Sequence, residues 1–271
     1  MGKVLVVTSG KGGVGKTTST AALGAALAVG GKRVVVVDFD VGLRNLDLVM
    51  GAERRVVFDL VNVVQGVAKL SQALIRDKRL ENLWLLPASQ TRDKDALTEE
   101  GVGRVIAELR EKFDWVICDS PAGIERGATL AMRFADEAVI VTNPEVSSVR
   151  DSDRIIGMLD SKTVRAERGE TVEKHVLITR YDAGRASRGE MLSIDDILEI
   201  LATPLVGIIP ESQDVLRASN VGSPVTLNDA QSLAARTYMD AAARLEGELV
   251  EMTVPVERKG FMQRFLGRRA A

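Results

Sequence analysis

Short runs of apolar, mostly β-branched residues recur along the chain and alternate with longer stretches of helical composition. Most of these runs are apolar throughout, which is typical of strands covered on both faces in a parallel sheet. The predicted strands are Val4–Val7, Val34–Val37, Leu83–Leu86, Val116–Ile117, Val139–Val141, Val176–Thr179 and Leu205–Ile209. The spacers between them predict helices, for example Thr17–Val29 and Asp229–Leu249. This alternation predicts an α/β fold with a doubly wound, mostly parallel sheet and helices on both of its faces.

The pattern continues without a repeat, a linker or a low-complexity segment to about residue 250. We therefore predict one domain over residues 1–250, a polar connector over 251–257 and a tail over 258–271. The chain has 271 residues, of which 45% are hydrophobic, so it can bury a sizeable core.

Composition and charge narrow the function classes. The formal net charge of −2 argues against a chain built mainly to bind nucleic acid. A single cysteine, Cys118, excludes an intrachain disulfide and a multi-cysteine metal site within one chain, and it suits a reducing compartment. The N-terminal residues lack the pattern of a signal peptide, and no stretch approaches the roughly 20 apolar residues that span a bilayer. These features predict a cytoplasmic protein whose membrane contacts are peripheral.

A glycine-rich motif lies between the first predicted strand and the first predicted helix. It matches the phosphate-binding pattern G-x-x-x-x-G-K-[ST], and its residues are Gly10, Lys11, Gly12, Gly13, Val14, Gly15, Lys16 and Thr17, followed by Thr18. The glycines let backbone N–H groups turn toward phosphate oxygens, and the helix N-terminus adds partial positive charge. Lys16 is predicted to bind the β- and γ-phosphates, and Thr17 to bind Mg²⁺. With a strand before it and a helix after it, the motif predicts a Mg·ATP site better than it does a chance glycine-rich turn.

Three aspartates follow predicted strands. Asp38 and Asp40 come after Val34–Val37, and Asp119 comes after Val116–Ile117. Ligands of open α/β sheets bind at the carboxyl ends of strands, so we predict that Asp119 holds Mg²⁺. Asp40 is predicted to orient the attacking water, with Asp38 as a supporting switch residue. The alternative is that these residues only cap helices or form turns.

Two further residues receive no chemical role. Cys118 lies inside an apolar run, which favours a small core residue over a reactive thiol. His175 opens a predicted strand, and no acid–base partner can be assigned to it from the sequence.

Lys11 is a second lysine in the glycine-rich loop, and by itself it reads as a solvated surface residue. However, K-G-G-x-G-K-T-T over residues 11–18 resembles the signature of the deviant Walker A class of P-loop ATPases. That resemblance implies that Lys11 reaches across a nucleotide-sandwich dimer to the phosphates of the second copy. There it would neutralise charge that develops during hydrolysis, as an arginine finger does.

Matching stretches occur along nearly the whole chain. They are SGKGGVGKTT (9–18), VDFDVGLRNLDLVMG (37–51), ERRVVFDLVNVVQG (53–66), LPASQTRDKDALT (86–98), CDSPAGIE (118–125), FADEAVIVTNPEVSSVRDSDRI (134–155), RASRGEML (185–192) and VLRASNVG (215–222). Together they resemble the MinD family of septum-site-determining ATPases, within the wider ParA/MinD group. The resemblance implies an ATP-dependent homodimer that binds the anionic inner membrane surface and recruits a MinC-like division inhibitor. A MinE-like activator would stimulate hydrolysis and release the dimer.

The partner surface and the pocket for the base can also be placed on the sequence, the first of them from the resemblance. The partner proteins would share a surface near the dimer seam, over Glu145–Arg154 and around Arg44–Asn45. Arg180 follows the predicted strand 176–179 and Pro210 ends the next predicted strand along the chain, and either could flank the adenine base.

The tail has the pattern of a short amphipathic helix. Phe261, Met262, Phe265 and Leu266 fall on one side of a helical wheel, and Lys259, Gln263, Arg264 and Arg268 fall outside that side. Terminal segments are often frayed or docked on their own domain, but the resemblance favours a membrane-targeting helix. Residues 268–271 run past the expected end of the family and add positive charge, which suits anionic lipid.

Other classes fit less well. A ParA-type DNA-partition ATPase remains the main alternative, and it would need a basic surface but no amphipathic tail. A reductase with a cluster shared between two chains needs two cysteines per chain, which this sequence lacks. A tyrosine kinase would need a C-terminal tyrosine cluster, whereas the only tyrosines are Tyr181 and Tyr238.

Overall fold

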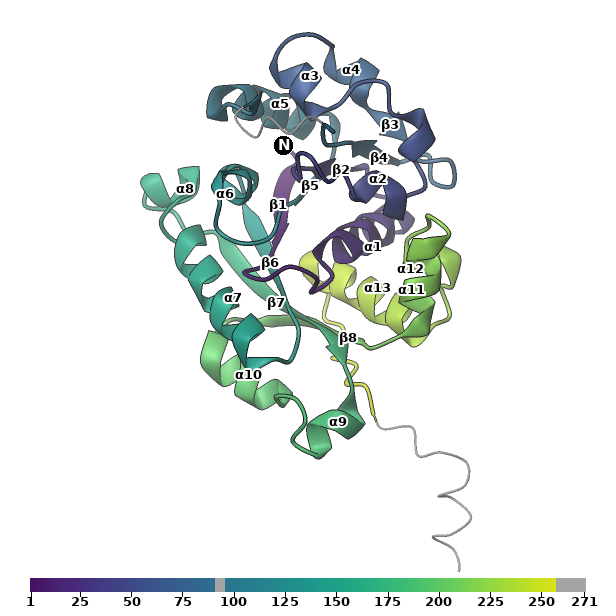
Figure 1. The fold of residues 1–271 in the computed structure, drawn as a ribbon, viewed down its shortest axis with the longest axis vertical. Helices are drawn as coiled ribbons and strands as arrows, with labels where there is room; N and C mark the ends of the chain where they lie inside the picture. The colour runs from purple at the N-terminus through teal and green to yellow at the C-terminus, as the bar shows by residue number, and fades with distance from the viewer. Residues whose placement is uncertain (91–95, 257–271) are drawn as a thin grey trace, which may run out of the picture.

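The centre of the molecule is one twisted sheet, seen in a computed structural model that describes residues 1–90 and 96–256. Its eight strands have the order β3-β4-β2-β5-β1-β6-β7-β8 (Figure 1). The strands are β1 (Lys3–Thr8), β2 (Val34–Asp38), β3 (Ile75–Arg76), β4 (Leu83–Leu86), β5 (Trp115–Asp119), β6 (Glu137–Thr142), β7 (Glu173–Tyr181) and β8 (Leu205–Pro210). All neighbouring pairs are parallel except β3 and β4. The predicted fold class is confirmed, and each predicted strand is present.

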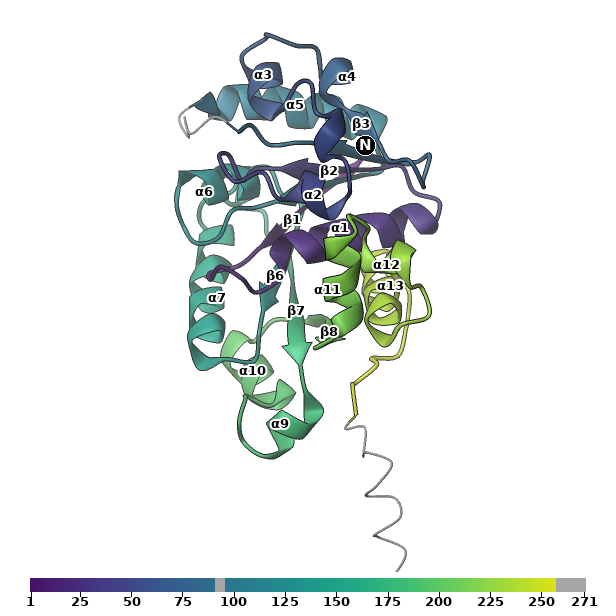
Figure 2. The ribbon, with the colours of Figure 1, turned by 45° about the vertical axis from the view of Figure 1, so that its right-hand side comes forward.

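Helices cover both faces of the sheet (Figures 1 and 2). They are α1 (Lys16–Val29), α2 (Leu46–Val49), α3 (Leu60–Val64), α4 (Leu70–Ala73), α5 (Glu99–Lys112), α6 (Arg126–Met132), α7 (Val146–Leu159), α8 (Val164–Glu167), α9 (Ala183–Ser187), α10 (Ile194–Leu201), α11 (Gln213–Asn220), α12 (Val225–Asn228) and α13 (Leu233–Leu245). The core on one face joins the sheet to α1, α2 and α11–α13. The other face packs against α3–α7, and a third cluster lies among α7, α10, β7 and β8.

Helix α1 packs closely on the sheet at Gly24, on a buried side that is rich in small residues. At Gly24 an added Cβ would lie 2.7 Å from a methyl carbon of Val36 on β2, which is too close for any side chain. This close packing fixes the start of α1, and with it the glycine-rich loop, against the carboxyl ends of the strands.

One predicted helix is shorter than expected. We predicted a helix over residues 229–249, but α13 begins at Leu233 because the Ser232 hydroxyl accepts a hydrogen bond from the Ala235 N–H at 3.2 Å. It ends near Gly247, whose φ of 85° lies in the left-handed region that glycine adopts at little cost.

The chain after α13 lies against the domain without forming a helix or strand (Figure 2). The Arg244 guanidinium donates hydrogen bonds to the carbonyl oxygens of Val206, Val250 and Glu251 at 2.8, 3.1 and 2.6 Å. The Thr253 hydroxyl adds one to Asp240 at 3.2 Å. The tail residues Phe261, Met262, Phe265 and Leu266 lie outside the described residues. Within the part that is described, no helix is long and apolar enough to cross a membrane.

Candidate functional site

The glycine-rich loop joins β1 directly to α1, as predicted. Gly13 and Gly15 have φ values of 77° and 98°, which other residues adopt only with strain. An added Cβ at either position would meet no atom within 4 Å, so both border open space at the N-terminus of α1. Gly10 differs, because a Cβ there would lie 2.3 Å from the carbonyl oxygen of Asp151 on α7. The loop therefore packs on α7 at its start and is open at its end, where the helix N-terminus favours an anion.

Lys16 is the first residue of α1 and is only 8% exposed. Its ammonium group donates a hydrogen bond to the Ser9 hydroxyl at 2.9 Å. Burial lowers the pKa of Lys16, and the negative charges of Asp119 and Asp40 oppose that shift. A buried ammonium bound to a neutral hydroxyl suits a group that pairs with phosphate charge.

Asp119 lies at the end of β5 and is fully buried. It accepts hydrogen bonds from the hydroxyl groups of Thr17 and Thr20, the latter at 3.0 Å. Burial raises the pKa of Asp119 to about 6, and the hydrogen bonds and the charge of Lys16 limit the rise. The structure thus brings together Thr17 and Asp119, the two residues predicted to hold Mg²⁺.

A second buried carboxylate stands beside Asp119. Asp38 is its register partner on the neighbouring strand β2. Burial and the nearby charge of Asp119 raise the pKa of Asp38 well above its usual range. Two adjacent carboxylates in a low-dielectric interior favour a cation between or beside them, and oxygen ligands are those that Mg²⁺ prefers. The residues present therefore fit a Mg²⁺ ion.

Asp38 also holds the loop that follows β2. Its carboxylate accepts hydrogen bonds from the backbone N–H groups of Asp40 at 2.8 Å and Leu46 at 3.2 Å. Asp40 is half-buried and close enough to Lys16 and Asp119 for its charge to act on the pKa of both. The predicted water-orienting residue thus lies beside the predicted phosphate and metal ligands.

Lys11 contacts its own chain. Its ammonium lies 2.8 Å from the Glu145 carboxylate and 3.1 Å from the Ser147 hydroxyl, both near the N-terminus of α7. The Lys11 and Glu145 side chains are 39% and 55% exposed, and the contact lowers the pKa of Glu145. The predicted role of Lys11 concerns a second copy of the chain and stays a prediction.

A cavity of about 260 Å³ opens beside the glycine-rich loop. Its lining includes Thr18, Arg180 and Pro210, all three of which were predicted to bind the nucleotide. Arg180 has a φ of 54°, a strained value for arginine, at the irregular end of the β7–β8 pairing. Both candidates for the base pocket border the same cavity, and their contact with the base stays a prediction.

Some residues of this site were missed by sequence reasoning. Ser9 and Thr20 contact Lys16 and Asp119, and Ser212 lines the cavity. Thr20 was detectable in principle, because it lies three residues after Thr17 and hence on the same face of α1. Ser212 follows β8 and caps α11, a strand-end position of the kind used to find the aspartates.

The two surface patches predicted to bind partner proteins differ in the solvent exposure of their side chains. Residues 146–154 form the first part of α7, Glu145 comes directly before it, and Val146 is exposed. Asn45 is also exposed. The Arg44 side chain is only 15% exposed, because its guanidinium lies 2.6 Å from the buried carboxylate of Asp47. Of the second predicted patch, Asn45 is therefore the accessible residue.

Comparisons with known proteins agree with this geometry. The family model described as the CobQ/CobB/MinD/ParA nucleotide binding domain matches residues 5–225. The chain is 62% identical over 270 residues to the septum site-determining protein MinD of Escherichia coli, which covers 98% of this chain and 100% of that protein.

Two solved structures are similar along most of the chain. A chain of the MinC:MinD cell division protein complex of Aquifex aeolicus aligns with a TM-score of 0.81 and 42% identity, covering 95% of this chain and 100% of that one. The septum site-determining protein MinD of Pyrococcus horikoshii, complexed with Mg-ADP, aligns with a TM-score of 0.79 and 31% identity, covering 91% and 96%. The range matched by the family model, residues 5–225, includes the loop and the strand ends that build the site.

Proposed function

The chain belongs to the CobQ/CobB/MinD/ParA family of nucleotide-binding domains and, within it, to the septum site-determining MinD proteins, and from this membership we propose that it is an ATP-driven switch for division-site placement. In this proposal it binds Mg·ATP, pairs with a second copy, and holds a division inhibitor at the cytoplasmic face of the inner membrane. Hydrolysis then releases it. The observation that carries the proposal is the convergence of Lys16, Thr17 and Asp119 at the open end of the glycine-rich loop.

Each group at this site has a task in binding the nucleotide. The loop, Gly10–Thr18, surrounds the phosphates, and Lys16 binds the β- and γ-phosphate oxygens. Thr17 and Asp119 hold Mg²⁺, which when bound neutralises charge on the phosphates. Arg180 and Pro210 flank the base at the cavity beside the loop. The Mg-ADP complex of the Pyrococcus horikoshii relative supports a magnesium-bound nucleotide as the ligand.

Hydrolysis of ATP adds two residues. Asp40 orients the attacking water, since it lies beside Lys16 and Asp119. Lys11 from the second copy approaches the phosphates and balances the charge that develops there. To do so it must leave Glu145, and an exposed ion pair of this kind contributes only about 0.2–1 kcal/mol. The contact seen in the single chain is therefore a small obstacle to dimerisation.

The nucleotide state can reach the surface through Asp38. This carboxylate lies beside Asp119 and holds the N–H groups of Asp40 and Leu46. A cation or phosphate at Asp119 changes the charge that Asp38 faces, and hence the hold on residues 40–46. That segment carries Leu43, which is 70% exposed, next to Asn45. The same few residues thus connect the chemistry to a surface where partners can bind.

Two partners are proposed for that surface. A MinC-like division inhibitor binds over Glu145–Arg154 and Asn45, and a MinE-like activator binds an overlapping area. The Aquifex aeolicus MinC:MinD complex supports the first partner. Overlap of the two areas would let the activator displace the inhibitor before it stimulates hydrolysis.

Membrane binding is assigned to the tail, residues 258–271. Each large apolar side chain contributes about 1.5–3 kcal/mol if fully buried, but ordering the segment costs about 1–2 kcal/mol per residue. One tail therefore binds weakly, whereas two tails on a dimer gain about 10²–10⁴ in avidity. ATP then controls membrane binding through dimerisation alone.

Sedimentation with anionic vesicles tests the proposal. The protein should sediment with ATP and stay in solution with ADP or without nucleotide. Phe265→Glu should abolish sedimentation and spare the ATP dimer, because it places a charge on the apolar side of the tail. Leu249→Glu is the matched control, since Leu249 is fully exposed outside the tail. Equal sedimentation in all three nucleotide states would contradict an ATP-driven switch.

A further inference from the structure

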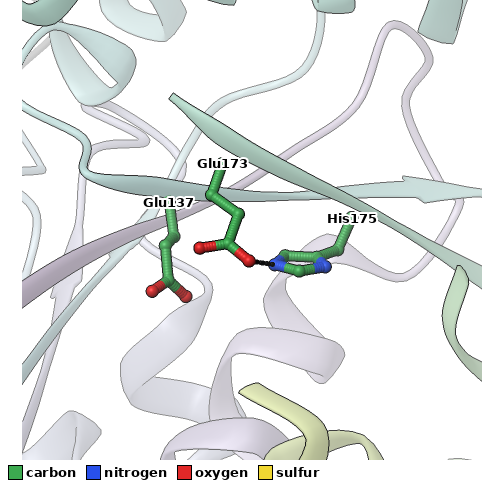
Figure 3. Close-up of side chains that lie close together, drawn as sticks. All are labelled: Glu137, Glu173 and His175. Carbon is green, nitrogen blue, oxygen red and sulfur yellow. Dashed lines mark ion pairs between the residues drawn. The ribbon is translucent and has the colours of Figure 1, made fainter. Parts of the chain in front are cut away.

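A second group of metal-ligating side chains lies at the amino ends of the strands, whereas the glycine-rich loop lies at their carboxyl ends. Glu137 opens β6, Glu173 opens β7, and His175 follows two residues later on β7. Glu137 and Glu173 are register partners on these neighbouring strands, and residues two apart on a strand share a face. One ligand atom from each of the three side chains lies within 4.8 Å of the others. In Figure 3 the Glu173 carboxylate stands between the other two side chains.

Two atoms of this group are buried without a hydrogen-bond partner among the residues that the structure describes. They are Glu137 Oε2 and His175 Nε2. The Glu137 side chain is only 6% exposed, and the nearest oxygen of Glu173 lies 3.5 Å from His175 Nε2, beyond the usual hydrogen-bond length. A buried carboxylate oxygen and a buried imidazole nitrogen that lack partners cost free energy. A ligand that accepts electron pairs from both would remove that cost.

Lys3 partly neutralises the group in the absence of such a ligand. Its ammonium lies 2.5 Å from Glu137 Oε1 and above the Trp115 ring, and its side chain is 51% exposed. Lys3 donates to Glu137 and leaves His175 Nε2 without a hydrogen-bond partner among the described residues. A neutral imidazole keeps one unprotonated nitrogen, and that nitrogen can bind a metal ion.

We propose that Glu137, Glu173 and His175 bind one divalent transition-metal ion of the Zn²⁺ class. Zn²⁺ takes histidine nitrogen and carboxylate oxygen at about 2.0–2.2 Å, whereas Mg²⁺ and Ca²⁺ prefer oxygen ligands alone. Tetrahedral bonds of that length place ligand atoms about 3.4 Å apart. The exposed Glu173 side chain can move inward to reach that spacing, and water completes the coordination. This site is separate from the Mg²⁺ site at Thr17 and Asp119, which lies at the carboxyl ends of the strands.

Lys3 and the metal compete for the same carboxylate. Both supply positive charge to Glu137, and the half-exposed Lys3 side chain can turn into solvent when the metal binds. Lys3→Met should therefore raise the affinity of this site for Zn²⁺ and leave its affinity for Mg²⁺ unchanged. A diffuse acidic patch would instead gain affinity for both ions, because it attracts cations by charge alone.

His175 provides a direct readout, because it is the only histidine of the chain. In the full chain, with any affinity tag removed and no nucleotide present, ZnCl₂ is added while the imidazole C–H signals are followed by proton NMR. The signals should shift or broaden until one Zn²⁺ per chain is bound, and an excess of MgCl₂ should not move them. An imidazole that stays unperturbed while Zn²⁺ binds would overturn the proposal, because the metal would then lie elsewhere.

Calorimetric titration of variants gives the second test. His175→Gln and Glu173→Gln should each lower the Zn²⁺ affinity about tenfold or more, and circular dichroism checks that they fold. Glu111→Gln is the matched control, because it removes the same charge from an exposed position at the end of α5, and it should bind Zn²⁺ as the unaltered chain does. Unchanged affinity in His175→Gln would refute the site. The NMR titration uses the unaltered chain, so the proposal stays testable if a variant does not fold.

Discussion

Lys11 is a good place to perturb the proposed switch, because it must leave Glu145 before it can reach a second copy. Glu145→Gln removes the charge that holds Lys11 and keeps the size of the side chain. The pair is half in solvent, with side-chain exposures of 39% and 55%, so its contribution is that of a surface ion pair, about 0.2–1 kcal/mol. Each dimer must release two lysines, which doubles the gain to about 0.4–2 kcal/mol. The dimer dissociation constant should fall about 2- to 30-fold.

Sedimentation equilibrium with Mg²⁺ and a non-hydrolysable ATP analogue measures this constant without turnover. Asp153→Asn is the matched control, because it makes the same charge change at an exposed position of α7. The gain of Glu145→Gln over this control should shrink in 1 M salt, where the Debye length is only about 3 Å. Lys11→Ala should abolish the dimer. If Glu145→Gln dimerises no better than Asp153→Asn, the pair does not restrain Lys11, and if it dimerises worse, Glu145 itself contacts the second copy.

Three further outcomes follow from the site. Lys16→Ala should lose Mg·ATP binding in an equilibrium binding assay, since the phosphates lose their buried counter-charge; normal affinity would refute the loop assignment. Asp40→Ala should still bind ATP and dimerise but release almost no phosphate, and parental turnover would make Asp40 a turn residue only. Burial raises the pKa of Asp119 to about 6 in the folded state. The contribution of this group to folding stability is therefore greatest at a pH below the ordinary aspartate pKa, and it is lost as the pH rises through about 6. Mg²⁺ binds the ionised carboxylate, so the rise in unfolding temperature given by Mg·ADP should grow from about pH 5 to pH 7 and stay flatter in Asp119→Asn; equal profiles would argue against Asp119 as a ligand.

Contiguous residues made the centre of the site predictable. The loop, the strand before it and the helix after it are adjacent in sequence, so their arrangement follows from local rules. Asp119 was also predictable, because carboxyl ends of parallel strands meet at one edge of the sheet. The cavity beside the loop was harder, since Thr18, Arg180 and Pro210 come from three distant segments. Which of them meet depends on the order of β1, β6, β7 and β8, and pattern alone does not give that order.

Other differences arise from side-chain bonds that periodicity does not encode. The start of α13 depends on one hydroxyl, that of Ser232. Arg44 was predicted on a partner surface, but the buried Asp47 requires a counter-charge and draws the guanidinium inward. Strand β3 has two residues and pairs antiparallel to β4, so it is too short to leave a periodic signal. In the first two cases a side-chain bond between residues three apart selected the outcome, and in the third the pairing with β4 did.

Arg244, which bonds the chain after α13, has a counterpart in Arg55 at the opposite edge strand of the sheet. Arg244 donates to the Val206 carbonyl on the edge strand β8, and Arg55 donates to the Arg76 carbonyl on the edge strand β3, at 2.6 Å. Both outer strands thus offer fewer free backbone acceptors to another chain and place a cation beside them, which discourages edge-to-edge β-pairing. Copies of this chain therefore meet more readily through helical faces and loops than through the edges of the sheet.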